Sequence, residues 1–174
     1  MLTATTEMAV RALVFIALRE REVDDAARPS ASPREIAEGI GASSTYLAKT
    51  LSTLVKAGIL RSSRGALGGV VLAIPAEQIT LLAIVQACQG LVTGDYCRVL
   101  GEATSPQVCG FHQAMFELHQ ATLDALKRWN LRMLADRPKP SGGLRGNSSC
   151  KLAMAGECGA MAPGGRRRFP AKKV

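Results

Sequence analysis

Residues 32–72 constrain the fold more than any other part of the chain, because two short helical segments joined by a glycine-containing turn precede a basic hairpin. The first segment has a strong start at Ser32, since a serine caps the orphan amides of a helix and the following proline suits its first position. A turn at 39–42 breaks this segment, and the second one ends at Gly58. Basic residues, glycines and paired valines over 61–72 indicate two short strands with a loop between them. This order predicts a winged helix-turn-helix, a motif that binds duplex DNA.

Apolar residues at helical spacing predict three further helices around this motif. The first covers residues 6–19 with a broad apolar stripe, and a shorter one follows the capping residue Thr80 and closes at Gly90. A long helix begins at Cys109 or the next residue and runs through Trp129, with a stripe too apolar for packing only against a small body. We expect that helix to form the interface of a dimer. We therefore predict a mainly α fold with a small β-wing, in which a winged helix-turn-helix is joined to a long dimerisation helix.

The net charge of +8 is unevenly distributed along the chain. Residues 1–136 carry 13 Lys and Arg against 13 Asp and Glu, whereas residues 137–174 carry nine basic residues against one acidic residue. We predict a winged helix-turn-helix DNA-binding domain over 1–90, a sensor loop and dimerisation helix over 91–136, and a basic disordered tail over 137–174. The tail either adds salt-dependent attraction to phosphates or is simply a solvated end.

Composition also indicates the cellular compartment of the protein and the class of molecule that it binds. Glu7 and Arg11 interrupt the N-terminal apolar residues, and no basic stretch precedes them, so neither a signal peptide nor a membrane span is predicted. We expect a cytoplasmic protein with no membrane partner. Five unevenly spaced cysteines do not suit a disulfide scaffold, and in a reducing compartment they suggest metal or redox chemistry. Aromatic residues make up only 4% of the chain, so a base-stacking surface for single-stranded nucleic acid is not expected.

The residues expected to contact DNA lie at the start of the second motif helix and in the hairpin. The second helix of such a motif enters the major groove, where exposed residues near its N-terminus meet base edges. Lys49 would neutralise a phosphate, and the hairpin would lie on the backbone or in the minor groove. The predicted set is Ser43, Ser44, Thr45, Tyr46, Lys49, Arg61, Arg64, Gly65, Gly68 and Gly69. The alternative interpretation is a winged helix that contacts protein instead of DNA.

Four separated segments in the expected order carry a resemblance to a known family. They are Thr6-Glu7-Met8-Ala9-Val10-Arg11-Ala12-Leu13, Ser44-Thr45-Tyr46-Leu47, Leu54-Val55-Lys56-Ala57-Gly58-Ile59-Leu60 and Arg64-Gly65-Ala66-Leu67-Gly68-Gly69. Over about residues 1–136 the chain resembles the bacterial winged-helix transcription regulators that include IscR, NsrR, RirA and CymR. The resemblance implies a homodimer with two winged-helix heads, a long helix crossing at the interface and a near-palindromic double-stranded DNA operator. One departure is Val70, where the family usually has tyrosine.

The same resemblance implies a sensor. Many family members hold an iron–sulfur cluster with three cysteines in the loop before the long helix, completed by a histidine or by an acidic residue of the partner subunit. Here Cys97 and Cys109 correspond to the outer cysteines and His112 to the histidine, but the loop has no middle cysteine. Glu7 stands at the position of the acidic ligand. The resemblance therefore implies a mixed set of Cys97, Cys109, His112 and Glu7 of the partner subunit, with 2Fe-2S as the expected cluster size.

Each of these candidate ligands has another interpretation. Cys97 and Cys109 are either ordinary thiols left after loss of a cluster or the two halves of a disulfide switch. An acidic residue such as Glu7 in the first turn of a helix is favoured by the helix dipole alone. Cys88 is close in sequence, and we expect it to pack as a small apolar residue.

The sequence thus predicts a dimeric DNA-binding transcription regulator, expected to be a repressor, that senses redox, nitric oxide or iron–sulfur status through a cysteine-ligated cluster. The alternative is a cluster-free regulator of the same fold that uses a Cys97/Cys109 thiol switch, a small molecule or a protein partner. We do not expect an enzyme. Cys109 and His112 lie one helical turn apart without an orienting Asn or Asp and without an oxyanion loop, which argues against a cysteine nucleophile.

Overall fold

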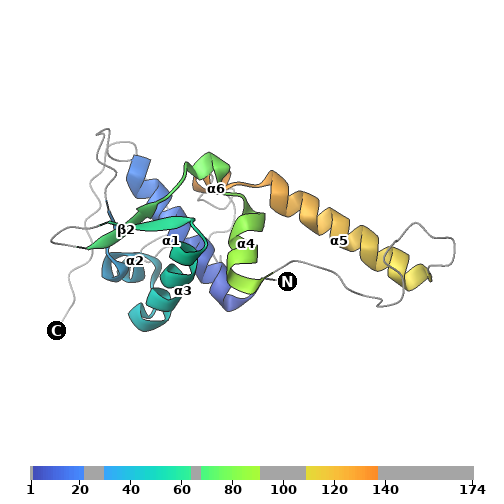
Figure 1. The fold of residues 1–174 in the computed structure, drawn as a ribbon, viewed down its shortest axis with the longest axis horizontal. Helices are drawn as coiled ribbons and strands as arrows, with labels where there is room; N and C mark the ends of the chain where they lie inside the picture. The colour runs from blue at the N-terminus through green and yellow to red at the C-terminus, as the bar shows by residue number, and fades with distance from the viewer. Residues whose placement is uncertain (1, 22–29, 64–67, 91–108, 137–174) are drawn as a thin grey trace, which may run out of the picture.

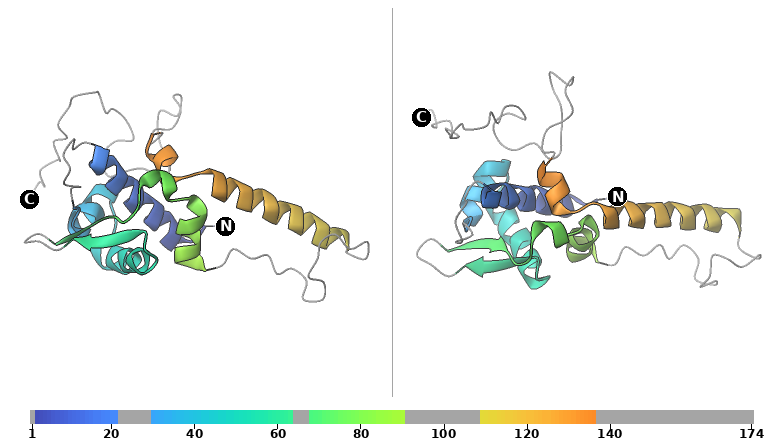
Figure 2. Two further views of the ribbon diagram at one scale, coloured as in Figure 1. Left: turned by 45° about the horizontal axis from the view of Figure 1, so that its top comes forward. Right: turned by 90° about the horizontal axis from the view of Figure 1, so that it is seen from above.

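The computed structural model describes residues 2–21, 30–63, 68–90 and 109–136. The elements are α1 (Ala4–Arg21), α2 (Pro33–Ile40), α3 (Ser44–Lys56), β1 (Leu60–Ser63), β2 (Gly69–Leu72), the 3-10 helix η1 (Ala76–Gln78), α4 (Leu81–Gln89), α5 (Gly110–Arg128) and α6 (Leu131–Asp136). Helices α1 to α4, α6 and the two strands form a head, from which α5 extends as a single straight helix (Figures 1 and 2). The mainly α fold with a small β-wing predicted from the sequence is confirmed.

Helix α1 is the centre of the head. It contacts α2, α3, α4, α6 and β2, and it crosses the middle of the head in Figure 1. Its buried residues are Thr6, Ala9, Val10, Ala12, Leu13, Val14, Phe15, Ile16 and Ala17. This set covers most of the helix circumference, which explains why the sequence shows a broad stripe and not a narrow amphipathic face. The core therefore forms around α1.

The helix-turn-helix starts where the sequence predicted it. Ser32 caps α2: its hydroxyl accepts a hydrogen bond from the Glu35 amide at 3.2 Å, and a Glu35 carboxylate oxygen accepts one from the Ser32 amide at 2.8 Å. This reciprocal capping box holds the pKa of Glu35 below its ordinary value, since the Ser32 amide stabilises the carboxylate. Helix α2 ends at Gly41, whose φ of 63° is left-handed.

Helix α3 packs through leucines spaced three and four residues apart. Leu47, Leu51 and Leu54 are buried, and Gly58 follows the helix with a φ of 72°. Ser43 holds the N-cap position, but its side chain makes no capping hydrogen bond within the described residues.

The wing is a two-stranded antiparallel sheet. Leu60 pairs with Leu72, and Ser63 pairs with Gly69. The backbones of Ala31 and Val70 exchange two hydrogen bonds, of 3.0 and 2.9 Å, which attach β2 to the start of the helix-turn-helix. Val70 itself is buried, so the residue at which the sequence departs from the family pattern fits into the head.

Helix α4 begins and ends where expected. The Thr80 hydroxyl accepts a hydrogen bond from the Ala83 amide at 3.1 Å, and Gly90 closes the helix with a φ of 83°. Two backbone hydrogen bonds of 2.8 Å tie the start of α4 to the chain between α5 and α6. The Leu81 amide donates to the Trp129 carbonyl, and the Leu131 amide donates to the Ile79 carbonyl. The base of α5 is therefore fixed to the head.

Helix α6 was not predicted from the sequence. Helix α5 ends at Trp129, and the Asn130 side chain accepts a hydrogen bond from the Met133 amide at 2.9 Å, which starts a new helix. This Asn cap is a local signal that could have revealed the break. Helix α6 buries Leu131 and Ala135 against the head.

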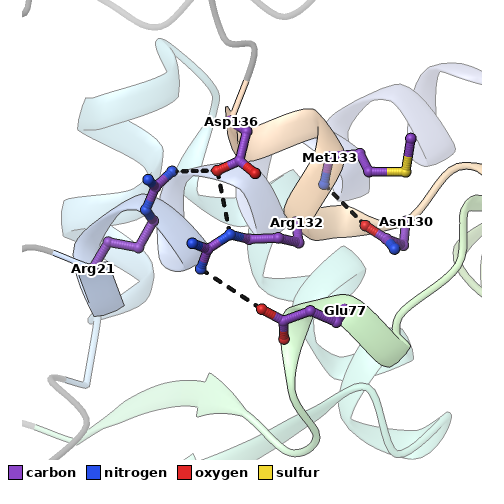
Figure 3. Close-up of polar contacts among 6 residues, drawn as sticks. All are labelled: Arg21, Glu77, Asn130, Arg132, Met133 and Asp136. Atoms are coloured by element: carbon purple, nitrogen blue, oxygen red, sulfur yellow. Dashed lines mark hydrogen bonds and ion pairs between the residues drawn. The ribbon is translucent and has the colours of Figure 1, made fainter.

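Polar contacts surround α6 at the surface (Figure 3). Asp136 pairs with Arg21 of α1 at 2.7 Å and with Arg132 at 3.2 Å, and Arg132 also faces Glu77 at 3.7 Å. Because all four side chains are substantially exposed, these pairs orient α6 more than they stabilise it.

In the part of the chain that the structure describes, no helix is both long enough and apolar enough to span a membrane. The predictions made for the loop at 91–108 and the tail at 137–174 concern residues outside the described ranges.

Gly39 provides a test of how α1 and α2 pack. A Cβ atom at this position would lie 2.2 Å from a carbon of the buried Phe15 ring. Gly39→Ala should therefore lower the free energy of unfolding, measured by urea denaturation, by about 1–3 kcal/mol, the usual cost of overpacking a core. Gly110→Ala is the control, because a Cβ atom there meets nothing within 4 Å. Equal stability of the two variants would contradict this packing.

Candidate DNA interface and sensor residues

The first two turns of α3 present a polar, acid-free surface. Among the predicted contact residues, Ser43, Ser44, Thr45, Tyr46 and Lys49 are all exposed. The helix contains no aspartate or glutamate along its whole length. Hydroxyl groups, a lysine and the positive end of the helix dipole therefore face outward with no carboxylate of α3 beside them.

This exposure follows from the way α3 packs. Leu47, Thr50, Leu51 and Leu54 lie on the buried face, and the helical period then turns the intervening polar residues outward. The Thr50 hydroxyl donates to the Tyr46 carbonyl at 3.2 Å, so the buried hydroxyl is satisfied within the helix. The apolar pattern that builds the core also builds the polar face.

Tyr46 differs from its neighbours because it has a partner within the head. Its hydroxyl lies 2.5 Å from the Thr5 hydroxyl in the first turn of α1. This contact was not predicted from the sequence, since the two residues are 41 positions apart. Tyr46 thus connects α3 to α1 while part of its ring remains exposed.

The wing residues are only partly described. Arg61 and Gly68 are exposed, whereas Arg64 and Gly65 lie outside the described residues. Gly69 is half-buried, and a Cβ atom on it would come within 2.9 Å of the Ala31 carbonyl oxygen. Glycine is required at this position by the attachment of β2 to the head, whatever the wing contacts.

The candidate cluster ligands lie on two separate elements. Cys109 occupies the N-cap position of α5 and is exposed, and His112 follows one turn later with a partly buried side chain. The His112 Nδ1 atom is buried and has no hydrogen-bond partner among the described residues. Glu7 lies in the first turn of α1. Cys97 is outside the described ranges.

Among the described residues, one protomer does not bring Glu7 together with Cys109 and His112. Within the described residues, no three His, Cys, Asp or Glu side chains lie close enough to share a metal ion. The N-terminal end of α5, which carries Cys109 and His112, lies far from the head that contains α1 (Figures 1 and 2). A site that uses Glu7 together with these two residues would therefore need two protomers.

The donor chemistry of Cys109 and His112 fits an iron–sulfur cluster. A thiolate and an imidazole one helical turn apart can ligate the same cluster, and the unpartnered Nδ1 atom is what an imidazole ligand requires. The described residues supply two such donors on α5, and the remaining ligands would have to come from elsewhere.

Cys88 does not resemble a ligand or a reactive thiol. It is partly buried at the end of α4, and burial raises its thiol pKa, although a hydrogen bond with Thr6 opposes that shift. The protonated thiol is therefore favoured, as expected for a small packing residue.

The family model of the Rrf2 proteins, described as iron-dependent transcriptional regulators, matches residues 2–137. The chain belongs to the Rrf2 family of transcriptional regulators. The resemblance inferred from the four sequence segments is confirmed, and the match is to a family of transcriptional regulators. A relative, the protein aau3 of Rhizobium meliloti (strain 1021), is 33% identical over 132 residues, which cover 75% of this chain and 81% of that protein.

Solved structures with the same fold include a CymR protein and an IscR protein. CymR of B. subtilis, the global cysteine regulator, matches with a TM-score of 0.65 and 23% identity over 78% of this chain and 96% of CymR. IscR of T. potens matches with a TM-score of 0.59 and 23% identity over 78% of this chain and 87% of IscR. These likenesses establish the Rrf2 fold and do not choose between sensing mechanisms.

The difference between the two described thiols is testable by alkylation. In iron-free folded protein at neutral pH, iodoacetamide should modify the exposed Cys109 before Cys88, because burial disfavours the Cys88 thiolate. Peptide mass spectrometry over a time course measures both rates, and protein unfolded in urea gives the reference. Equal rates in the folded protein would contradict the packing assigned to Cys88.

Proposed function

We propose that this Rrf2 protein is a homodimeric repressor in which α3 enters the major groove of duplex DNA. The observation that carries the proposal is the exposed, acid-free face of α3, whose hydroxyl groups and Lys49 lie on the same head as the exposed Arg61 of the wing. Such a face suits the anionic backbone and the donor and acceptor pattern of base edges.

Each predicted residue has a role in this proposal. Hydroxyl groups at 43–45 bind bases or phosphates near the start of α3, and Lys49 neutralises a phosphate. Tyr46 presents the exposed part of its ring to the groove. The wing residues lie against the backbone or in the minor groove; they are Arg61, Arg64, Gly65, Gly68 and Gly69.

The dimer is supported by helix α5. None of its residues is buried in the single protomer, and Phe111 and Leu118 are 67% and 57% exposed. A second copy packed along this helix would remove that apolar surface from water. Two heads related by a twofold axis would then fit a near-palindromic operator.

Lys49 tests the assignment of the recognition helix. Lys49→Ala should weaken binding to a duplex selected from a random pool, and it should reduce the slope of log K against log salt by about 1, as expected for one lost phosphate contact. Lys127→Ala is the matched control, because Lys127 is exposed in the last turn of α5 and is not among the proposed DNA contacts. An unchanged slope in Lys49→Ala would contradict the assignment.

For the sensor, we propose that Cys97, Cys109, His112 and Glu7 of the partner subunit hold a 2Fe-2S cluster in a cytoplasmic regulator of redox, nitric oxide or iron–sulfur status. When bound, such a cluster supplies a centre whose oxidation state and integrity respond to these signals. Support comes from the two donors on α5 and from the unpartnered His112 Nδ1 atom. Because α1 and the far end of α5 are separated in one protomer, the dimer completes the site.

A cluster-free regulator is the second candidate. The described residues of one protomer offer no complete metal site, and the sequence lacks a middle cysteine in the loop before α5. The fold also matches CymR, a cysteine regulator. In that case Cys97 and Cys109 form a thiol switch, or a small molecule or protein partner provides the signal.

Spectroscopy separates the two candidates. Protein purified without oxygen should absorb visible light and contain iron and sulfide, and Cys97→Ala should lose both. Cys88→Ala is the control and should keep them, because Cys88 packs against the core, forms a hydrogen bond with Thr6 and is not a proposed ligand. Colourless, iron-free wild-type protein that still binds DNA would contradict the cluster.

A further inference from the structure

The first turn of α1 is held by a small hydroxyl network. Thr3 precedes the helix, and its hydroxyl accepts a hydrogen bond from the Thr6 amide at 3.3 Å. The Thr3 carbonyl accepts one from the Glu7 amide at 2.9 Å, and the Thr3 and Thr6 hydroxyls lie 3.0 Å apart. Thr3 therefore caps α1 in the manner preferred for threonine.

The last residue of α4 completes this network. The Gln89 Oε1 atom accepts hydrogen bonds from the Thr3 amide at 2.8 Å and from the Thr6 hydroxyl at 2.7 Å. Because a backbone N–H group only donates, the atom facing it must be the amide oxygen and not the nitrogen. Thr6 is fully buried at 0% exposure, so Gln89 satisfies a hydroxyl that water does not reach. One oxygen atom thus holds the residue that caps α1 and a residue of its first turn.

The same turn of α1 contacts the recognition helix on its other side. Thr5 lies between Thr3 and Thr6 in this turn, and its hydroxyl meets the Tyr46 hydroxyl at 2.5 Å. Helices α1, α3 and α4 all contact one another, with α1 central in Figure 1. A residue at the end of α4 and a residue in the first turn of α3 are therefore connected through a single helical turn.

We infer that Gln89 is a positioning residue for DNA recognition: it fixes the first turn of α1, and that turn fixes Tyr46 through Thr5. Gln89 precedes Gly90, after which the chain continues to the proposed ligand Cys97. The contact thus couples the end of α4 to the recognition helix. The regulatory meaning of this coupling rests on the proposed function, whereas the coupling itself is a property of the head.

Geometry makes this link sensitive to small movements. Both hydrogen bonds to α1 share the Gln89 Oε1 atom, and hydrogen bonds weaken steeply once the heavy atoms separate beyond about 3.5 Å. A displacement of the end of α4 by about 1 Å would therefore break both contacts together. Loss of the two contacts would leave Thr3 and Thr6 held by their mutual contacts and by the Thr6 hydrogen bond with Cys88, which loosens the turn that carries Thr5.

Hydrogen exchange of the full chain, resolved by residue, tests the coupling without DNA. The amides of residues 7–10 and 47–50 are the first to be bonded within α1 and α3. Gln89→Leu should accelerate exchange in both groups about fivefold, the factor that corresponds to loss of a helix cap. Gln86→Leu is the matched control, one turn earlier on α4, and should leave both groups unchanged.

Two further variants separate positioning from general damage. Gln89→Glu keeps an acceptor oxygen and should retain wild-type exchange, even if the leucine variant does not fold. Thr5→Val removes only the contact with Tyr46, and should accelerate residues 47–50 while leaving residues 7–10 protected. Faster exchange at 7–10 in Gln89→Leu with no change at 47–50 would overturn the inference, as would unchanged exchange in both groups.

Binding of a duplex selected from a random pool then tests whether this coupling affects DNA recognition. Gln89→Leu and Thr5→Val should each weaken binding, and the double variant should be no weaker than the weaker single variant, because both act through one link. Additive losses would overturn the link to DNA recognition. Failure of the wild-type protein to select any duplex would instead contradict the proposed function, and the exchange result would still decide the coupling.

Discussion

The burial of α1 is the constraint on which the rest of the structure depends. The helix-turn-helix, the wing, α4 and α6 all contact this helix, and its Leu13 and Ile16 side chains are fully buried. Burying one such Leu or Ile side chain stabilises the head by about 1.5–3 kcal/mol, whereas each exposed ion pair around α6 contributes about 0–1 kcal/mol. The head is thus held by apolar packing around one helix, and polar contacts orient the elements on it.

This arrangement explains how one short helix can serve both the core and the proposed function. Leucines of α3 pack inward, so its hydroxyl groups and Lys49 face outward at the same helical spacing. The first turn of α1 is the exception to the apolar rule, because its threonines face the ends of α3 and α4.

Local signals predicted most of the fold. Ser32 and Glu35, Gly58, Thr80 and Gly90 mark helix ends through contacts within a few residues, so the sequence alone indicates them. The Asn130 cap is of the same kind and was overlooked, which is why α6 was missed.

Contacts between distant residues were not predictable in this way. Gln89 meets Thr3 and Thr6 across more than 80 positions, and a lone glutamine has no sequence signature for such a partner. Likewise, the family resemblance implies that Glu7 comes from the partner subunit, and the separation of α1 from the far end of α5 supplies the physical reason. These relationships depend on where the residues lie in the fold, and not on their residue types.

The central claim is that two such heads, joined along α5, bind duplex DNA through α3 and the wing. Hydroxyl-radical footprinting of a duplex selected by the full-length protein tests it most directly. The account predicts two protected backbone patches on one face of the duplex, about one helical turn of 10–10.5 base pairs apart from centre to centre. A single continuous patch, or no protection at concentrations where the protein is dimeric, would contradict it.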